Sequence, residues 1–171
     1  MPSRRSQISS GILAFRPRAR WEVLLVHPGG PYWRKRDEGA WSIPKGVVES
    51  DSDLLAAARR EFNEETGFDA QGEFIALRPV RQKSGKLVHA FAVEGDFDLS
   101  RFASNSFDLE WPPRSGRYAQ FPEADQAAYF DFGEALRKII PYQRPLLLEL
   151  CERLRARAAA TPGRLSRLAQ P

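Results

Sequence analysis

The sequence contains little cysteine and no long apolar run. Among its 171 residues Cys151 is the only cysteine, which excludes an intramolecular disulfide framework and a cysteine-based zinc cluster and is compatible with a reducing cytosol. No apolar run approaches the roughly 18 residues that a membrane helix needs. The apolar stretch at residues 11–15 is too short for the core of a signal peptide. We therefore expect a cytoplasmic protein without a membrane partner.

Acidic residues are absent from both ends of the chain. Residues 1–20 and residues 153–171 each hold five arginines and no aspartate or glutamate. The formal net charge of +4 therefore conceals a middle part, residues 21–152, with 16 of the 26 basic residues and all 22 acidic ones. A uniformly basic protein would suggest a nucleic-acid surface, whereas an acidic body favours a site for cations.

The chain length fits one domain, and no internal repeat is present. We expect a flexible arm over residues 1–8, a single domain over residues 9–155, and a basic, disordered tail over residues 156–171. Predicted strands alternate with predicted helices, which indicates an α/β domain with helices on both faces of the sheet.

Apolar patterning predicts the elements of this domain. Strands are expected at residues 9–15, 21–27, 73–80, 87–93 and 127–132. Helices are expected at residues 53–66 and 133–139, and from Pro145 onward. Residues 104–122 are rich in Pro, Ser, Gly and Arg and predict a long loop, which in a compact domain is usually functional.

The helix expected at residues 53–66 has clear end signals. Asp51 or Ser52 can cap its start, and Gly67 can end it in the left-handed conformation. Its apolar stripe comprises Leu55, Ala58 and Phe62.

Three carboxylates lie on one face of this helix. Glu61, Glu64 and Glu65 stand at i, i+3 and i+4, and three like charges so close together need a cation beside them. Oxygen ligands without Cys or His select a hard ion, Mg²⁺ or Mn²⁺. Upstream, Lys45 adds a cation and Gly46 permits close approach of the backbone to a ligand. A lysine beside a divalent metal is typical equipment for holding polyphosphate.

Residues 46–68 resemble the Nudix box, G-x5-E-x7-R-E-U-x-E-E-x-G-U, where U is a bulky apolar residue. Eight of the nine defined positions match: Gly46, Arg60, Glu61, Phe62, Glu64, Glu65, Gly67 and Phe68. The exception is Ser52, which stands where the box has its first glutamate. In the family that glutamate pairs with the box arginine, so Arg60 needs another partner, for which Glu49, Asp51 and Asp53 are candidates.

The resemblance implies a Nudix fold, a mixed β-sheet between α-helices, over about residues 8–155. It also implies Mg²⁺-dependent hydrolysis of a nucleoside diphosphate linked to another group, with Mn²⁺ as a substitute. Arg60 and the three helix glutamates form the expected catalytic set, and Gly46 joins these glutamates in holding the metal. Family members often add a glutamate before the final strand, which makes Glu123 the expected further ligand or base, with Glu110 in reserve.

Several residues are expected to bind substrate. Lys45, together with Arg34 or Arg36, would stabilise phosphate charge. Aromatic and basic residues of the 104–122 segment would bind a base: Trp111, Arg114 and Tyr118. Trp41 opens a W-x-x-P-K-G segment that resembles the one shared by diadenosine polyphosphate hydrolases and RNA 5′-pyrophosphohydrolases. The tyrosine that some dinucleotide polyphosphate hydrolases carry about 17 residues after the box is absent.

Three hypotheses for the function follow. The first is hydrolysis of a dinucleoside polyphosphate such as diadenosine tetraphosphate. The second is removal of pyrophosphate from RNA 5′ ends, or from a nucleoside triphosphate, with the arginine-rich ends holding the RNA. The third, from another class, is a catalytically weak nucleotide-sensing module, which only Ser52 supports.

Overall fold

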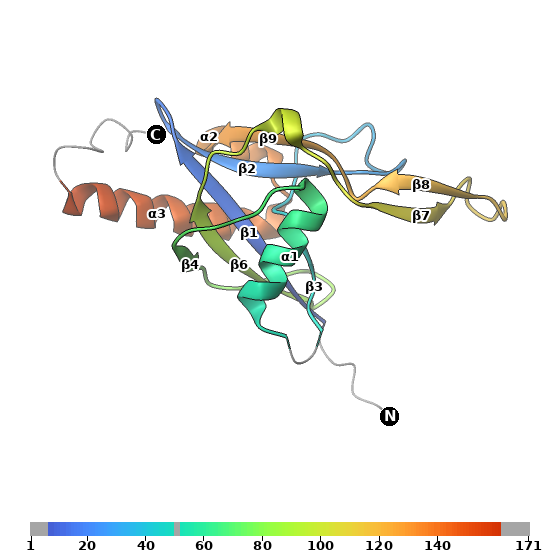
Figure 1. Ribbon diagram of the computed structural model, residues 1–171, viewed down its shortest axis with the longest axis horizontal. Coiled ribbons are helices and arrows are strands. Elements are labelled where there is room, and N and C mark those ends of the chain that lie inside the picture. Colours follow the sequence, from blue (N-terminus) through green and yellow to red (C-terminus); the bar gives the residue numbers. More distant parts are fainter. Residues whose placement is uncertain (1–6, 50–51, 162–171) are drawn as a thin grey trace.

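A mixed, seven-stranded β-sheet forms the centre of the protein (Figure 1). The computed structural model describes residues 7–49 and 52–161. Five strands follow the order β4-β6-β1-β2-β9, while β3 pairs with β1 and β5 with β6. The strands of this sheet are β1 (Ile8–Pro17), β2 (Trp21–Pro28), β3 (Lys45–Val47), β4 (Phe74–Ala76), β5 (Val80–Arg81), β6 (Leu87–Glu94) and β9 (Ala124–Asp131).

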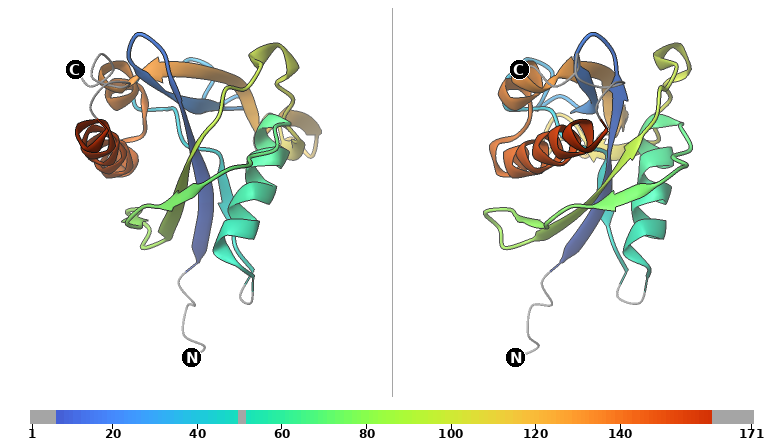
Figure 2. Two further views of the ribbon diagram at one scale, coloured as in Figure 1. Left: turned by 60° about the vertical axis from the view of Figure 1, so that its left-hand side comes forward. Right: turned by 90° about the vertical axis from the view of Figure 1, so that its left-hand side faces the viewer.

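Helices cover both faces of the sheet, as the sequence predicts. Helix α1 (Leu54–Thr66) lies on one side, and α2 (Phe132–Lys138) and α3 (Arg144–Ala160) lie on the other (Figure 2). Two 3₁₀ turns, Leu99–Arg101 and Pro141–Gln143, complete the helical segments. The parallel pairing of β1 with β6, among otherwise antiparallel pairs, makes the sheet mixed.

Strand β1 separates two hydrophobic clusters because its side chains alternate between the faces. Ile12 and Ala14 pack in the cluster beneath α1, whereas Leu13 and Phe15 pack in the cluster beneath α2 and α3. A strand buried on both faces needs a continuous apolar run, which these residues provide. The cluster beneath α1 contains Ala58 and Phe62 and so fixes the helix against β1.

Helix α1 begins and ends close to the predicted residues, but its cap differs. The side chain of Asp53 accepts a hydrogen bond from the backbone N–H of Ala56 at 2.8 Å, so Asp53 is the N-cap in place of Ser52. The other expected cap, Asp51, lies outside the described residues. Gly67 ends the helix at φ 78°, as predicted.

The prediction of a loop over residues 104–122 is wrong. Strands β7 (Ser106–Glu110) and β8 (Tyr118–Pro122) form a hairpin that projects from the body (Figure 1). Phe107 and Phe121 pair across it with ring centroids 6.3 Å apart. In each strand apolar and polar residues alternate, which is typical of a β-strand. The Pro- and Gly-rich composition of the turn between them led to the prediction of a loop.

The predicted strand at residues 73–80 is two short strands, β4 and β5, which both pair with β6. Lys45 and Gly46 lie in β3, which pairs with β1. Strand β1 begins at Ile8, and α3 continues to Ala160, five residues beyond the expected domain end. Within the described residues no helix is both long and apolar enough to cross a membrane.

Candidate functional site

Helix α1 presents its carboxylates because its other face is anchored in the core. Ala58 and Phe62 are fully buried in the cluster beneath α1. Glu61, Glu64 and Glu65 follow at positions that turn toward β3 and the start of β9. Glu61 is only 9% exposed. Glutamate side chains are rarely this buried unless a positive charge is paired with them. The helix therefore holds three carboxylates at the edge of the sheet.

Gly46 lies directly against Glu61. A Cβ atom at Gly46 would stand 2.0 Å from the carboxyl carbon and 2.0 Å from Oε2 of Glu61. Only glycine leaves room for this carboxylate beside the backbone of β3. The sequence predicts that a ligand approaches the backbone at Gly46, and in the structure the Glu61 side chain lies there. This contact sets the distance between β3 and α1.

Arg60 finds its partners on its own helix. Its guanidinium group lies 3.3 Å from Oε1 of Glu61 and 3.3 Å from Oε1 of Glu64. The expectation that Asp53 or Glu49 replaces the missing box glutamate is wrong: Asp53 caps α1, and no ion pair of Glu49 occurs within the described residues. Ser52 is exposed. Arg60 therefore offsets the charge of the carboxylates themselves.

Glu65 is turned toward β3. Its Oε2 accepts a hydrogen bond from the backbone N–H of Lys45 at 3.3 Å. Burial raises the pKa of Glu65 to about 8, against the opposing effects of the Lys45 charge and of this hydrogen bond. Helix α1 and strand β3 are thus joined by a carboxyl group that is poorly solvated.

Glu123 lies beside the helix carboxylates, and Glu110 does not. Partial burial, and then the charge of Glu64, raises the pKa of Glu123. Glu110 stands at the far end of β7, where its Oε1 accepts a hydrogen bond from the N–H of Gly116 at 2.8 Å. Since β7 leads away from the body, Glu110 caps the turn of the hairpin.

The backbone fixes the position of Glu123. The N–H of Glu123 donates to the carbonyl of Asn105 at 2.8 Å, and the N–H of Asn105 donates to the carbonyl of Glu64 at 2.8 Å. The carbonyl of Glu123 accepts from the N–H of Gly29 at 2.9 Å. Asn105 therefore links the end of α1 to the start of β9. Sequence reasoning missed Asn105, because its contribution is made by backbone groups and leaves no signal in residue type.

The donor set fits a hard divalent cation. Burial, and then the charge of Glu64, raises the pKa of Glu61, with Glu123 adding to the effect and Arg60 opposing it. A cluster in which carboxylates raise one another's pKa is stabilised by a cation, and oxygen ligands suit Mg²⁺. Within residues 7–49 and 52–161, no three such side chains already stand in ligand geometry. Arg60 and the Lys45 N–H hold Glu61, Glu64 and Glu65 in the present arrangement.

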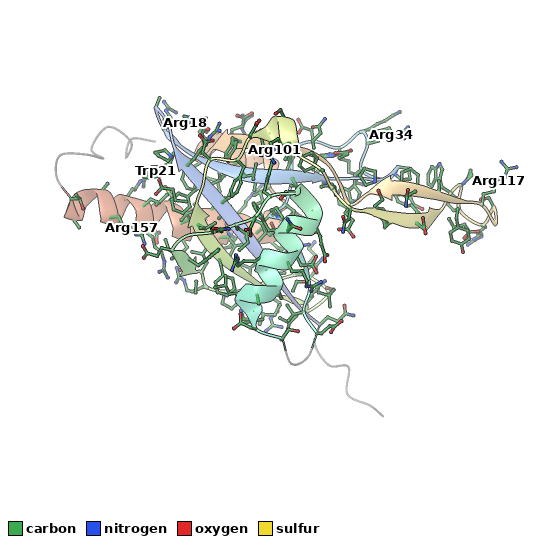
Figure 3. All side chains as sticks on the ribbon, in the orientation of Figure 1. Arg18, Trp21, Arg34, Arg101, Arg117 and Arg157 are labelled. Atoms are coloured by element: carbon green, nitrogen blue, oxygen red, sulfur yellow. The ribbon has the colours of Figure 1, made fainter. Side chains whose placement is uncertain are left out.

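The expected substrate-binding residues divide into two groups. Trp41 is 5% exposed and belongs to the core, where its indole N–H donates to Asp37 at 2.8 Å. Lys45 lies in β3, next to the helix carboxylates. Arg34 and Arg36 lie in the exposed segment between β2 and β3, and Figure 3 shows Arg34 toward the hairpin. The carbonyl of Arg36 lies 2.6 Å from Nε2 of the buried His27.

The aromatic residues of the hairpin contact this same segment. The ring of Trp111 meets the ring of Tyr32 edge to face, with centroids 5.4 Å apart. Trp111 is half-buried, whereas Tyr118 is 73% exposed and Arg114 is exposed in the turn. The structure thus brings Trp111 to the segment after β2, while Arg114 and Tyr118 lie at the outer end of the hairpin.

Comparison with known proteins places these features in a family. Residues 5–150 match the family model described as the NUDIX domain. Nudix hydrolase 10 of Arabidopsis thaliana is 29% identical over 112 residues, which cover 66% of this chain and 36% of that protein. RNA pyrophosphohydrolase of Caulobacter vibrioides is 44% identical over 50 residues, covering 26% and 29% respectively. The chain thus spans about a third of the length of these relatives.

Solved structures share the fold. The chain superposes on a Caenorhabditis elegans Ap4A hydrolase, crystallised as a binary complex, with a TM-score of 0.58 at 18% identity. This superposition covers 86% of the present chain and 98% of the other. At this identity the similarity concerns the arrangement of the sheet and helices.

Proposed function

The chain belongs to the NUDIX domain family, and from this premise we propose that it hydrolyses a pyrophosphate bond in a nucleoside diphosphate linked to another group. The preferred substrate under this proposal is a dinucleoside polyphosphate such as diadenosine tetraphosphate. Mg²⁺ would be the cofactor, with Mn²⁺ as a substitute.

The observation that carries the proposal is the proximity of Glu123 to the carboxylates of α1. The two hydrogen bonds of Asn105 connect the backbones of Glu64 and Glu123, which are far apart in the sequence. Glu123, between β8 and β9, is then close enough to the carboxylates of α1 for their charges to raise one another's pKa: Glu61 and Glu65 respond to Glu123, and Glu123 responds to Glu64. If the glutamates of α1 were only a solvated helix face, there would be no reason for Glu123, from another part of the chain, to lie beside them.

Each residue has a role that its position supports. When bound, Mg²⁺ would neutralise phosphate oxygens and lower the pKa of a bound water. Glu61 and Glu64 would hold the ion, together with Glu65 and the backbone of Gly46. Glu123 would act as a further ligand or take a proton from the attacking water. Lys45 would stabilise negative charge on the phosphates, and Arg60 would restrain Glu61 and Glu64 until the ion binds.

The alternative substrate is the 5′ end of RNA, which the C. vibrioides relative favours by its name. In this reading the arginine-rich ends would bind the RNA backbone. Four of their six described arginines form ion pairs within the protein: Arg16, Arg18, Arg153 and Arg157. Paired arginines contribute less to phosphate binding, so the dinucleotide remains the first candidate.

A substrate panel at two salt concentrations tests the proposal. Cleavage of diadenosine tetraphosphate into two nucleotides and release of pyrophosphate from 5′-triphosphorylated RNA are measured with Mg²⁺. We expect faster cleavage of the dinucleotide than of the RNA end, with a weak dependence on salt. RNA binding weakens steeply with salt because counterions are released, so a preferred RNA substrate would show a steep loss. Binding of nucleotides without any hydrolysis would instead indicate a sensing module.

A further inference from the structure

His27 is buried at the end of β2, and both of its ring nitrogens contact oxygen atoms. Its Nδ1 lies 2.7 Å from Oδ1 of Asp125, and its Nε2 lies 2.6 Å from the carbonyl oxygen of Arg36. A carboxylate and a carbonyl oxygen only accept hydrogen bonds, so the ring makes both hydrogen bonds when both nitrogens carry a proton. His27 thus joins two segments that are distant from each other in the sequence.

Asp125 is the extra residue of a β-bulge at the start of β9. In the pairing of β2 with β9 the register shifts directly after His27, which leaves Asp125 without a partner of its own. Bulges are frequent next to active sites, where they redirect a side chain. Glu123, the expected ligand or base, precedes Asp125 by two residues. The hydrogen bond from His27 therefore restrains the bulge beside which Glu123 lies.

The start of β9 packs closely against the end of β2. The backbone N–H of Gly29 donates to the carbonyl of Glu123 at 2.9 Å. A Cβ atom at Gly29 would stand 1.8 Å from the carbonyl oxygen of Pro122. Parts that pack this closely transmit strain, so a shift of the bulge at Asp125 would also move Glu123.

The second hydrogen bond of His27 restrains the segment between β2 and β3. The backbone N–H of Arg36 donates to the carbonyl of Trp33 at 2.8 Å, and the guanidinium group of Arg36 lies 5.5 Å from the centre of the Trp33 ring. Arg34 and Arg36 are themselves exposed. Because His27 binds the main chain of this turn, it sets the position from which both arginines extend.

We propose that His27 is a positioning residue with two separate effects on the proposed reaction. Through Nδ1 and Asp125 it holds Glu123 in place beside the carboxylates of α1. Through Nε2 it holds Arg34 and Arg36 where they meet the phosphates of the substrate. The inference rests on the proposed function, and it adds the residue that relates the phosphate-binding segment to the carboxylate site.

Two substitutions separate the two effects. In His27→Asn the amide nitrogen takes the place of Nδ1, so the hydrogen bond to Asp125 is kept and that to Arg36 is lost. The KM for diadenosine tetraphosphate should then rise about fivefold with kcat nearly unchanged, because only substrate binding is weakened. In His27→Gln the amide nitrogen takes the place of Nε2. Here kcat should fall about tenfold with little change in KM, because Glu123 is displaced.

A histidine with a structural role alone would not divide the kinetic constants in this way. Equal changes in the two variants, or no change in either, would therefore overturn the proposal. Circular dichroism and thermal unfolding show whether each variant is folded.

Asp125→Ala tests the same link from the other side. It should lower kcat as His27→Gln does, and the double variant should be no worse than either single one, because both changes remove one hydrogen bond. Gln126→Ala, at the neighbouring exposed position, is the control and should leave kcat and KM unchanged. Losses that add in the double variant would contradict the link.

Hydrogen exchange measured by mass spectrometry tests the link without catalysis. Exchange should become faster in residues 30–36 for His27→Asn and in residues 122–126 for His27→Gln. If exchange divides in this way while the wild-type protein hydrolyses no nucleotide, the proposed function fails although His27 positions both segments. If diadenosine tetraphosphate is hydrolysed and both variants match the wild type in exchange and kinetics, the inference fails and the proposed function stands.

Discussion

At the scale of single residues, Arg60 shows what the sequence could and could not predict. The box register correctly assigns Glu61, Glu64 and Glu65 to one face of α1, since helical periodicity alone decides that. It does not reveal that Arg60 pairs with Glu61 and Glu64. Once Ser52 replaces the usual glutamate, the choice among nearby carboxylates depends on side-chain directions in the folded protein.

Ser52→Glu should leave turnover equal or raise it. The introduced carboxylate would compete for Arg60 and so release Glu61 and Glu64 toward the metal. Steady-state kinetics over a range of Mg²⁺ concentrations measures the effect, with Ser52→Gln as the uncharged control. A large drop in turnover for Ser52→Glu, without a similar drop for the control, would show that Ser52 has a role of its own.

Gly46→Ala should reduce kcat/KM by about tenfold to a hundredfold, because the added Cβ would stand 2.0 Å from the Glu61 carboxyl group and displace it. The matched control is Gly133→Ala in α2, where the nearest atom to the added Cβ is 3.4 Å away. Thermal unfolding of both variants reports on the fold. Wild-type activity of Gly46→Ala would contradict the packing of Glu61 against β3.

At the scale of elements, local patterns predict the helices better than the short strands. The apolar stripe and end signals locate α1 to within one residue, because a helix satisfies its own hydrogen bonds. The hairpin β7–β8 and the separation of β4 from β5 depend on pairing partners distant in sequence. The position of Glu123 likewise depends on residues distant in sequence, because its backbone is hydrogen-bonded to Asn105 and Gly29.

Helix α3 is joined to the segment after β4 by Glu149. Its Oε2 accepts a hydrogen bond from the backbone N–H of Arg78 at 2.9 Å, and its Oε1 lies 2.8 Å from the guanidinium group of Arg153. Burial raises the pKa of Glu149, but these hydrogen bonds outweigh burial and lower it. A pKa that is lower in the folded state stabilises the protein above the pKa of the unfolded chain, and this contribution is lost as the pH falls through the folded value.

Glu149→Gln should therefore destabilise the protein by about 1–3 kcal/mol at neutral pH, and the difference should shrink as the pH falls below about 4.5. Urea unfolding at a series of pH values measures it. Glu152→Gln, at an exposed position of α3, is the control and should change stability little. A destabilisation of Glu149→Gln that is independent of pH would contradict the role of its charge.

At the scale of the whole molecule, four of the six described arginines of the two arginine-rich ends form ion pairs within the protein. Arg16 and Arg18 share Asp96, and Arg157 pairs with Glu73. Figure 3 places Arg18 and Arg157 at the end of the molecule opposite Arg34 and Arg117. Composition predicts the charge of each segment but not its partners, because those partners come from segments distant in the sequence.

The central claim is that the carboxylates of α1 hold a divalent cation on which pyrophosphate hydrolysis depends. The most direct measurement compares the rates at which the wild-type protein and Glu64→Gln cleave diadenosine tetraphosphate into two nucleotides during a titration with Mg²⁺. We predict saturable activation of the wild-type protein and a loss of about a hundredfold or more in the variant, with its fold intact by circular dichroism. Activity that is independent of Mg²⁺, or a variant that turns over like the wild type, would contradict the account.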